Sequence, residues 1–235
     1  MAPLPRTLRG SDRRHERGAA ATLTSDPRSG QYAWVPDRRR HWDTVYETTA
    51  SDALSWYEPT PATSLRLVRE EVSPSASVID VGAGASTLVD GLLASGYDDL
   101  TLLDISAKAL GEVRARLGSE ATKVRFLESD VLSWTPDRTF DLWHDRAVFH
   151  FLTEPDARAE YVRIVSGTLA ERGVLVLATF AADGPDQCSG LPVARYTERS
   201  LADGFPFLAL LRSERVEHLT PSGSVQPFIY VAMRR

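Results

Sequence analysis

The sequence predicts an α/β fold in which helices cover both faces of a mostly parallel β-sheet. Short apolar runs, of the kind that form buried parallel strands, alternate with helical segments up to about Val176. Such alternation builds βαβ units with right-handed crossovers. The chain has 235 residues, of which 43% are hydrophobic, and this suffices for one domain of ordinary size with a sizeable core.

The expected elements follow in order along the chain. A short helix begins near His41, and a second helix at Ala62–Val72 precedes the sheet. The alternating part then contains a strand at Ser77–Asp80, a helix at Thr87–Ser95, a strand at Leu100–Asp104, a helix at Ala107–Leu117 capped by Ser106, strands at Lys123–Glu128 and Phe140–Trp143, a helix at Asp156–Leu169 and a strand at Gly173–Thr179. Two last strands are expected at Leu208–Val216 and Phe228–Met233. Their turn-rich connection holds no helix, so they should be antiparallel.

Residues 1–35 differ in composition from the rest of the chain. They combine arginines and prolines with little apolar periodicity, and we expect a disordered segment there, followed by a folded domain at residues 36–235. A transit peptide is the alternative, because such peptides are rich in arginine. The acids Asp12, Glu16 and Asp26 count against it.

Composition excludes several classes of function. The net charge of −5 disfavours a nucleic-acid partner bound through a broad basic face. No apolar run approaches the ~18 residues of a membrane span. Cys188 is the only cysteine, which leaves neither a disulfide framework nor a cysteine-based zinc site. We therefore expect a cytoplasmic protein that binds no membrane, nucleic acid or metal, and the sequence specifies no oligomeric state.

The most informative motif lies where the first strand ends. Asp80 is followed by Gly82 and Gly84, and glycine lets the backbone turn sharply there and a ligand approach it. A dinucleotide site needs a third glycine for its helix, but Thr87 stands at that position. S-adenosylmethionine (SAM) has no pyrophosphate, and its sulfonium and ammonium groups suit the acid at Asp80. The motif therefore favours SAM over a nicotinamide cofactor, with an ordinary strand-to-loop turn as the plain alternative.

Acids also follow the second and third strands. Asp104 lies 20 residues beyond Gly84, where a carboxylate can accept hydrogen bonds from both ribose hydroxyls of a nucleoside, and Ile105 is next to it. Asp130 suits the exocyclic amine of an adenine, and Val131 suits a face of the ring. Taken alone, Asp104 is equally typical of an acid at a helix start, and Asp130 of a surface turn. Their order along the chain favours ligand binding.

The three motifs together resemble those of class I SAM-dependent methyltransferases over about residues 41–235. The resemblance implies a Rossmann-like sheet of seven strands with one antiparallel strand near its edge. It also implies an enzyme that uses SAM and releases S-adenosylhomocysteine (SAH). One departure is Ser86, which stands where the first motif of the family has its third glycine. Serine is small, so we expect little damage to cofactor binding.

The fourth strand ends in a stretch dense in reactive groups. Asp145 and Arg146 resemble the acid–arginine pair of thiopurine-type methyltransferases, which lies beside the cofactor and the substrate pocket. Arg146 either grips a substrate carboxylate or pairs with Asp145 and braces the loop. His144 and His150 are either bases that deprotonate the acceptor or hydrogen-bonded structural groups. These four residues are the catalytic candidates.

Two further segments resemble a branch of small-molecule methyltransferases. By that resemblance Trp42 and Tyr46 lie over the methionine end of SAM, where aromatic faces attract a sulfonium. Alternatively, they staple an N-terminal helix to the sheet. Eukaryotic lysine methyltransferases share a looser Trp-Asp-x-x-Tyr form of this segment. The Gly/Pro-rich stretch 180–192 stands where a substrate lid is expected, and within it Cys188 is expected to be a packed residue rather than a nucleophile.

The function that these features favour is methyl transfer from SAM to an N, O, S or heavier chalcogen atom of a small molecule. Positioning and desolvation should supply most of the rate, because the methyl group arrives already activated. A protein lysine methyltransferase and a SAM-binding module without catalysis are the alternatives. A nicotinamide-dependent oxidoreductase is a more distant one. The sequence does not identify the acceptor.

Overall fold

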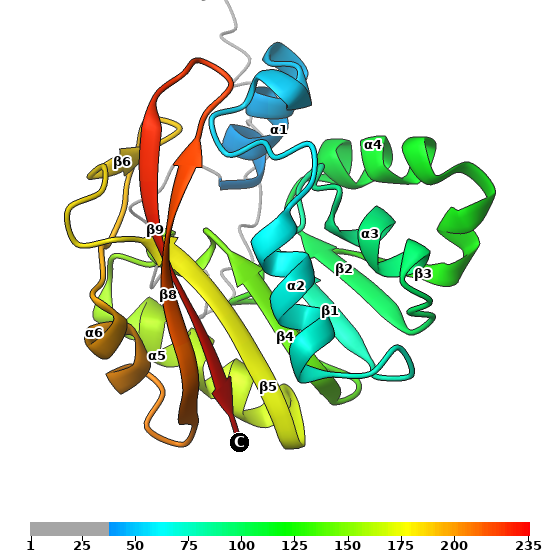
Figure 1. Ribbon diagram of the computed structural model, residues 1–235. Coiled ribbons are helices and arrows are strands. Elements are labelled where there is room, and N and C mark those ends of the chain that lie inside the picture. Colours follow the sequence, from blue (N-terminus) through cyan, green and yellow to red (C-terminus); the bar gives the residue numbers. More distant parts are fainter. Residues whose placement is uncertain (1–37) are drawn as a thin grey trace, which may run out of the picture. The chain divides into compact units, whose positions relative to one another are not determined.

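The computed structural model describes residues 38–235, and the predicted disorder of residues 1–35 lies outside the described residues. In the described part, seven strands form a large sheet in the order β3-β2-β1-β4-β5-β9-β8 (Figure 1). The bounds of these strands are Val78–Val81 for β1, Leu100–Asp104 for β2, Val124–Glu128 for β3, Phe140–Arg146 for β4, Leu169–Phe180 for β5, Ala209–Leu219 for β8 and Val225–Arg234 for β9.

The directions of the strands agree with the sequence. Strands β1 to β5 pair in parallel, whereas β9 runs antiparallel to both of its neighbours, β5 and β8. This confirms a mostly parallel sheet with one antiparallel strand next to the edge. The strand order changes direction between β1 and β4. Open α/β sheets bind their ligands beyond the carboxyl ends of the strands at such a point.

Helices flank the sheet. Their bounds are Arg38–Thr48 for α1, Ala62–Glu71 for α2, Leu88–Ala94 for α3, Ala107–Leu117 for α4, Pro155–Thr168 for α5 and Glu198–Asp203 for α6. Short 3₁₀ turns occupy Ser51–Ala53 (η1), Gly118–Lys123 (η2) and Phe149–Phe151 (η3). A small hairpin joins β6 (Gln187–Cys188) to β7 (Leu191–Pro192) inside the predicted lid. The sequence analysis predicts neither this hairpin nor α6, and it ends β4 three residues early, at Trp143.

Local signals explain where the helices begin and end. The Ser106 hydroxyl accepts a hydrogen bond of 3.2 Å from the backbone N–H of Ala109, as expected of the N-cap of α4. Gly118, with φ of 55°, ends that helix in a conformation that other residues rarely adopt. A capping box of Thr197 and Ser200 begins α6.

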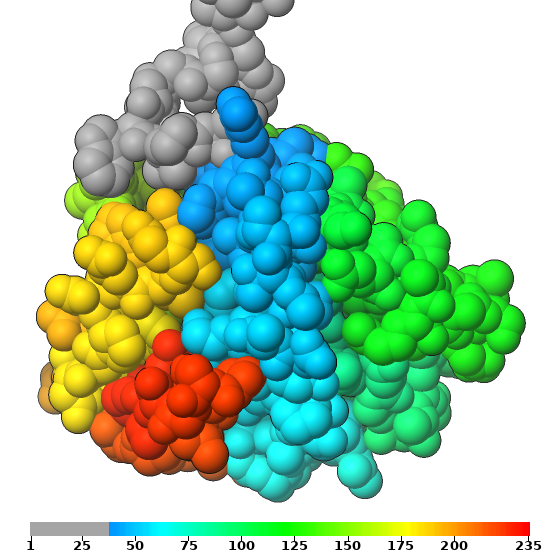
Figure 2. Space-filling model, turned by 90° about the horizontal axis from the view of Figure 1, so that it is seen from above, coloured from blue at the N-terminus to red at the C-terminus, as the bar shows by residue number. Residues whose placement is uncertain are grey.

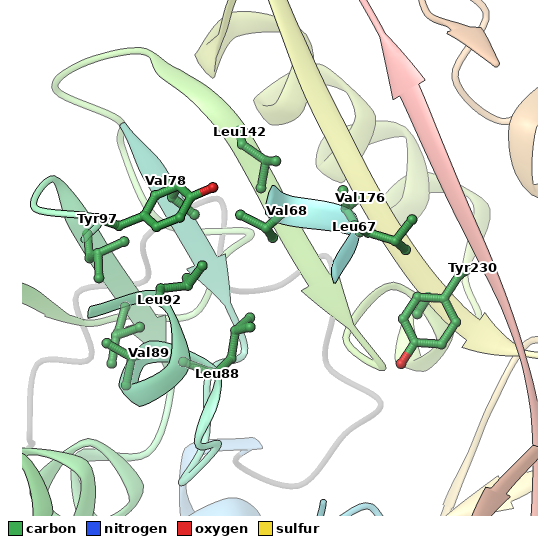
Figure 3. Close-up of a cluster of buried hydrophobic side chains, with 14 of the residues drawn as sticks. Leu67, Val68, Val78, Leu88, Val89, Leu92, Tyr97, Leu142, Val176 and Tyr230 are labelled. Atoms are coloured by element: carbon green, nitrogen blue, oxygen red, sulfur yellow. The ribbon is translucent and has the colours of Figure 1, made fainter. Parts of the chain in front are cut away.

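The main hydrophobic cluster lies between the sheet and the helices α2 to α4. Figure 3 shows Val68 of α2 beside Leu142 of β4, and Leu67 beside Val176 of β5. All four side chains are at most 1% exposed. Burying an aliphatic side chain of this size contributes roughly 1.5–3 kcal/mol, so the cluster fixes α2 firmly on the sheet.

The two faces of β4 meet different helices. Successive side chains of a strand point to opposite faces, so Leu142 and His144 face α2 whereas Trp143 and Asp145 face α5 on the other side. Accordingly, the indole N–H of Trp143 donates a 2.9 Å hydrogen bond to the hydroxyl of Tyr161 in α5. This alternation decides which of the candidate residues can share a site.

The carboxyl edge of the sheet carries most of the candidate residues. Figure 2 looks onto this edge, with α1 in blue between the yellow segment that contains β6 and the green region around α4. None of the helices in residues 38–235 combines the length and the hydropathy that crossing a membrane requires.

Candidate functional site

Two adjoining cavities open at this edge, around the switch between β1 and β4. The larger one has an empty volume of about 900 Å³, a figure that includes the solvent at its mouth. The smaller one lies behind the glycine turn, against α2. Four side chains or backbone segments line both cavities: Tyr46, Trp56, Gly82 and Arg146.

The structure brings the predicted cofactor residues together. The larger cavity is lined by Trp42, Tyr46, Gly82, Asp104, Ile105, Asp130 and Val131. The remaining two, Asp80 and Gly84, line the smaller cavity. The ends of β1, β2 and β3 therefore meet at one place, as the motifs require.

The Asp104 carboxylate holds the glycine turn as well as facing the cavity. Its Oδ2 accepts a hydrogen bond of 2.7 Å from the Gly84 N–H, and its Oδ1 accepts one of 2.8 Å from the Ser106 N–H. Burial raises the pKa of Asp104 to about 6, although these backbone donors favour the charged form. Each carboxylate oxygen can accept a second hydrogen bond, so both remain able to receive a ribose hydroxyl.

The glycine turn lets two side chains of the protein, Val148 and Tyr46, approach the backbone closely. Gly82 and Gly84 have φ of 65° and 53°, a region that residues with a Cβ rarely adopt. A Cβ at Gly82 would overlap the side chain of Val148, and one at Gly84 would overlap the hydroxyl of Tyr46. The Asp104 carboxylate, with the glycine turn beside it at the cavities, fits a nucleoside ligand such as SAM.

Helix α1 closes the cofactor side through polar contacts and aromatic packing. The Ser106 hydroxyl donates a 2.6 Å hydrogen bond to Asp43, and Arg38 lies 3.6 Å from the Asp130 carboxylate. Between these anchors, the Trp42 ring packs edge-on against Phe151, with 5.1 Å between the ring centroids. Trp42 and Tyr46 thus attach the helix to the site and also line the cavity.

His144 and Asp80 form a buried pair that α2 completes. The two residues are register partners on β4 and β1, and His144 Nδ1 lies 2.7 Å from Asp80 Oδ1. His144 Nε2 lies 2.9 Å from the hydroxyl of Ser64. Both ring nitrogens therefore have partners, and His144 holds β1, β4 and α2 together beneath the smaller cavity.

Asp145 does not lie beside Arg146, which corrects one of the two alternatives for this pair. Neighbouring residues of β4 point to opposite faces of the sheet, so the two side chains diverge. The Asp145 carboxylate accepts hydrogen bonds from the backbone of Val148, at 2.8 Å, and Phe149, at 3.1 Å, and from the Tyr161 hydroxyl. Burial raises its pKa to about 6. It braces the loop after β4 and lines neither cavity.

Arg146 lies where the two cavities meet. Its Nε donates a 3.0 Å hydrogen bond to the Tyr230 hydroxyl, and its Nη1 donates one of 2.9 Å to the backbone carbonyl of Trp56. The guanidinium lies 4.6 Å from the centre of the Phe228 ring, and the Glu58 carboxylate lies 3.4 Å from Nε. No hydrogen-bond partner within residues 38–235 meets Nη2, although this atom is buried.

His150 is buried in the turn η3 behind the cavity wall. Its ring packs against Phe151 and Phe180, with centroid distances of 4.4 Å and 4.8 Å. Neither ring nitrogen has a partner among the described residues. Burial, with a further contribution from the charge of Arg146, lowers the pKa of His150 to about 3. The imidazole is therefore neutral near pH 7, and it lines neither cavity.

The segment predicted to be a lid forms part of the wall of the larger cavity, on the side that we call the acceptor side. Cys188, in the hairpin, lines the larger cavity, and burial raises the pKa of its thiol to about 11. A thiol that stays protonated is a poor nucleophile, which agrees with the expected packing role. Phe180 and Phe228 complete this wall.

Sequence reasoning missed several residues of the site, namely Glu58, Ser64, Phe228 and Tyr230. Phe228 and Tyr230 reach it from β9, and their spacing of two residues places both on one face of that strand. The alternation along β9 shows that these two residues share a face of the strand, but the sequence does not show that this face lies next to the cavity. Glu58 and Ser64 carry no local pattern at all.

Comparisons with known proteins agree with this geometry. Residues 78–173 match the protein family described as Methyltransferase domain. Among curated proteins, the human EEF1A lysine methyltransferase 2 is 27% identical over 183 residues, which is 69% of this chain and 77% of that protein. The mouse eEF1A lysine and N-terminal methyltransferase is 27% identical over 134 residues, and the match spans 57% of this chain but only 19% of that protein.

Solved structures show the same fold. A Burkholderia thailandensis 1,6-didemethyltoxoflavin-N1-methyltransferase, crystallised with 1,6-didemethyltoxoflavin and SAH, superposes with a TM-score of 0.66. It is 20% identical, and the alignment covers 92% of this chain and 93% of that one.

Proposed function

Because the chain is a class I SAM-dependent methyltransferase, with SAM as its methyl donor, we propose that it methylates a small, planar organic molecule. The observation that carries this proposal is the composition of the acceptor side of the larger cavity. Aromatic rings wall it on several sides, and the β6–β7 hairpin covers it. Such a space suits a flat molecule that is mostly enclosed.

The aromatic wall comes from five separate parts of the chain, one of which is Phe180 at the end of β5. Trp42 belongs to α1, Trp56 follows η1, Phe151 ends η3 and Phe228 belongs to β9. Trp42 packs edge-on against Trp56, with 5.9 Å between the centroids. Rings arranged in this way offer faces and edges on which a planar acceptor can stack.

Methyl transfer at this site depends on positioning. SAM supplies an electrophilic methyl group. The acceptor forms a bond to this methyl group as its bond to sulfur breaks, and SAH is the leaving group. The protein's contribution is to orient the acceptor and to keep water out, because α1 and the hairpin close over the cavity. No histidine or lysine is among the described residues that line the larger cavity. A base is needed only for an acceptor atom that is protonated at the working pH.

A protein lysine methyltransferase is the second candidate. The named relatives favour it, since both are enzymes of that kind by name, and one of them aligns over 77% of its length. The charged residues that line the larger cavity disfavour a lysine substrate. Arg146, a cation that would repel a lysine ammonium, lines the larger cavity, and the carboxylates that line it, Asp104 and Asp130, belong to the proposed cofactor residues.

The decisive experiment labels methyl acceptors without assuming what they are. Purified protein is incubated with methyl-labelled SAM and with extract separated into a small-molecule fraction and a protein fraction. We expect label in the small molecules, and none in protein bands above the level of a Gly82→Ala control.

Other distributions of label have distinct meanings. Label confined to protein bands would replace the proposed function with lysine methylation, and alkaline hydrolysis followed by amino-acid analysis would identify methyl-lysine. Binding of SAM with no label in either fraction would indicate a SAM-binding module without catalysis.

A further inference from the structure

One buried donor at the acceptor side lacks a partner. Arg146 uses Nε and Nη1 for hydrogen bonds to Tyr230 and to the Trp56 carbonyl, whereas Nη2 has none within residues 38–235. The side chain is only 11% exposed. Leaving a charged N–H buried and unpaired is costly, so a hydrogen-bond acceptor brought by a ligand would stabilise this group.

A second unpaired group lies in the same region. His150 has no partner for either ring nitrogen in the described part of the chain, and it lies close enough to Arg146 for the guanidinium to disfavour its protonation. Neutral imidazole still offers one N–H donor. The His150 ring packs against Phe151 and Phe180, and both of these residues line the larger cavity. The cavity wall thus contains one unpaired donor on a permanent cation, Arg146, and His150 lies behind that wall.

The charges next to Arg146 bear on the charge of the acceptor. Glu58 lies 3.4 Å from Arg146 Nε and 3.7 Å from His218 Nδ1, so it is shared between two partners. Without cofactor, Arg146 and Glu58 approximately cancel. The sulfonium of SAM then adds a positive charge to a site that excludes water, where charges interact strongly. A negatively charged group of an acceptor beside Arg146 would be attracted to both the guanidinium and the sulfonium.

We propose that the acceptor of this methyltransferase is an aromatic or unsaturated acid, whose carboxylate is received by Arg146 Nη2 while its planar body packs among the aromatic rings of the larger cavity. This inference rests on the proposed function and names the substrate class of the same site. Arg146 is then a residue that determines specificity. Nη2 has no solvent-exposed surface, so the proposal requires side chains that line the cavity to move aside when the acid binds.

Matched pairs of acids and amides test the proposal. Protein saturated with SAH is titrated calorimetrically with benzoate and benzamide, cinnamate and cinnamamide, and 2-naphthoate and 2-naphthamide. Each pair shares one carbon skeleton and differs in charge. We expect at least one acid to bind about 10- to 100-fold more tightly than its amide, as a charge-assisted hydrogen bond in a buried site would produce.

Two substitutions assign the effect to Arg146. Arg146→Gln should lower the affinity for that acid to the level of its amide while leaving the affinity for SAH within about twofold. Since Arg146 also donates hydrogen bonds to the Tyr230 hydroxyl and the Trp56 carbonyl, this variant can fail to fold. Glu58→Gln is the safer complement, because it removes the competing carboxylate and should tighten binding of the acid by a measurable factor, with no change for the amide.

Several results would overturn the proposal. Equal affinities of acids and amides would show that water, not a carboxylate, accepts the hydrogen bond from Nη2. The proposed small-molecule function would then stand. The absence of binding by any probe to protein that binds SAH would also reject it. A loss of SAH affinity in Arg146→Gln equal to its loss of acid affinity would assign Nη2 to the carboxylate of the cofactor itself. Failure of the proposed function is a separate outcome, read from label in proteins alone.

Discussion

Asp104 and Gly84 are joined across 20 residues by a 2.7 Å hydrogen bond from the Gly84 N–H to the Asp104 carboxylate. The acid expected to hold the ribose therefore also fixes the turn on which the ligand lies. Such a bond is charge-assisted, because the acceptor is ionised. Binding of the nucleoside and the shape of the glycine turn consequently depend on a single titrating group.

The affinity for SAM should depend on pH through Asp104. Burial raises its pKa to about 6, so the carboxyl becomes protonated as the pH falls below that value. A protonated acid accepts fewer hydrogen bonds from ribose hydroxyls and loses the bond from Gly84 in its charge-assisted form. We expect the dissociation constant for SAH, measured by calorimetry, to be constant above about pH 7 and to rise by about tenfold per pH unit below 6.

Asp104→Asn separates this effect from acid unfolding. The amide cannot ionise, so its SAH affinity at pH 7.5 should be about 10- to 100-fold weaker and should change little between pH 7.5 and 5. Variant and parent should converge as the pH falls. If the variant shows the same pH dependence as the parent, a different group controls cofactor binding.

The glycine turn should tolerate no side chain at position 82. Gly82 has φ of 65°, and a Cβ there would overlap Val148, so Gly82→Ala strains the backbone and pushes into the cavity wall. We expect loss of SAH binding by more than about 100-fold and a decrease of about 1–3 kcal/mol in the free energy of unfolding. Calorimetry and urea denaturation measure the two effects.

Gly111→Ala is the matched control. Gly111 is exposed in α4, and no heavy atom would lie within 4 Å of its Cβ. That change should raise stability by about 0.5–1 kcal/mol, because glycine is unfavourable inside a helix, and it should leave SAH binding unchanged. Wild-type affinity in Gly82→Ala would mean that the cofactor does not lie on this turn.

Helix α1 should contribute to cofactor affinity through Asp43. The 2.6 Å hydrogen bond from Ser106 to Asp43 anchors the helix that carries Trp42 and Tyr46. Asp43→Ala should weaken SAH binding by about tenfold, corresponding to the loss of one hydrogen bond of about 1–1.5 kcal/mol. Glu47→Ala, on the exposed side of the same helix, should leave the affinity unchanged. Equal effects of the two substitutions would show that Asp43 acts only through its charge.

Much of the fold could be predicted because its signals are local. The strands β1, β2 and β3 are short apolar runs closed by turn residues, and Ser106 is a cap that can be read from sequence. The hairpin of β6 and β7 could not be predicted, because each strand has two residues and depends on tertiary contacts such as the bond from Ala194 N–H to the His150 carbonyl.

The candidate site was predictable on the cofactor side and not on the acceptor side. Asp104 and the glycines follow strands in sequence, so their positions are fixed by the parallel order. Arg146 was found, but its partner was not. Pairing with Asp145 is one of the two alternatives that the sequence leaves open. Because β4 extends to Arg146, the two side chains lie on opposite faces of the sheet. Glu58 comes from a loop, where sequence separation carries no geometric information.

His150 should make stability depend on pH in a direction opposite to the buried acids. Burial lowers its pKa to about 3, below the ordinary value of about 6.5, so between these values the unfolded chain binds a proton that the folded one does not. Stability contributed by the neutral imidazole is therefore lost as the pH falls through this window, by about 2 kcal/mol between pH 7.5 and 5. Asp104 and Asp145 have pKa values raised to about 6, so their protonation increases the stability of the folded protein as the pH falls from 6 toward 4.

Replacing the imidazole by a ring that cannot titrate isolates its contribution. His150→Phe keeps an aromatic group among Phe151 and Phe180. The difference between variant and parent at pH 7.5 measures packing alone, and it should shift by about 2 kcal/mol in favour of the variant at pH 5, as urea denaturation would show. A difference that stays constant over this range would place the pKa of His150 near its ordinary value. It would then restore this residue as a candidate base, because an imidazole that exchanges protons near pH 7 has access to water or to the acceptor.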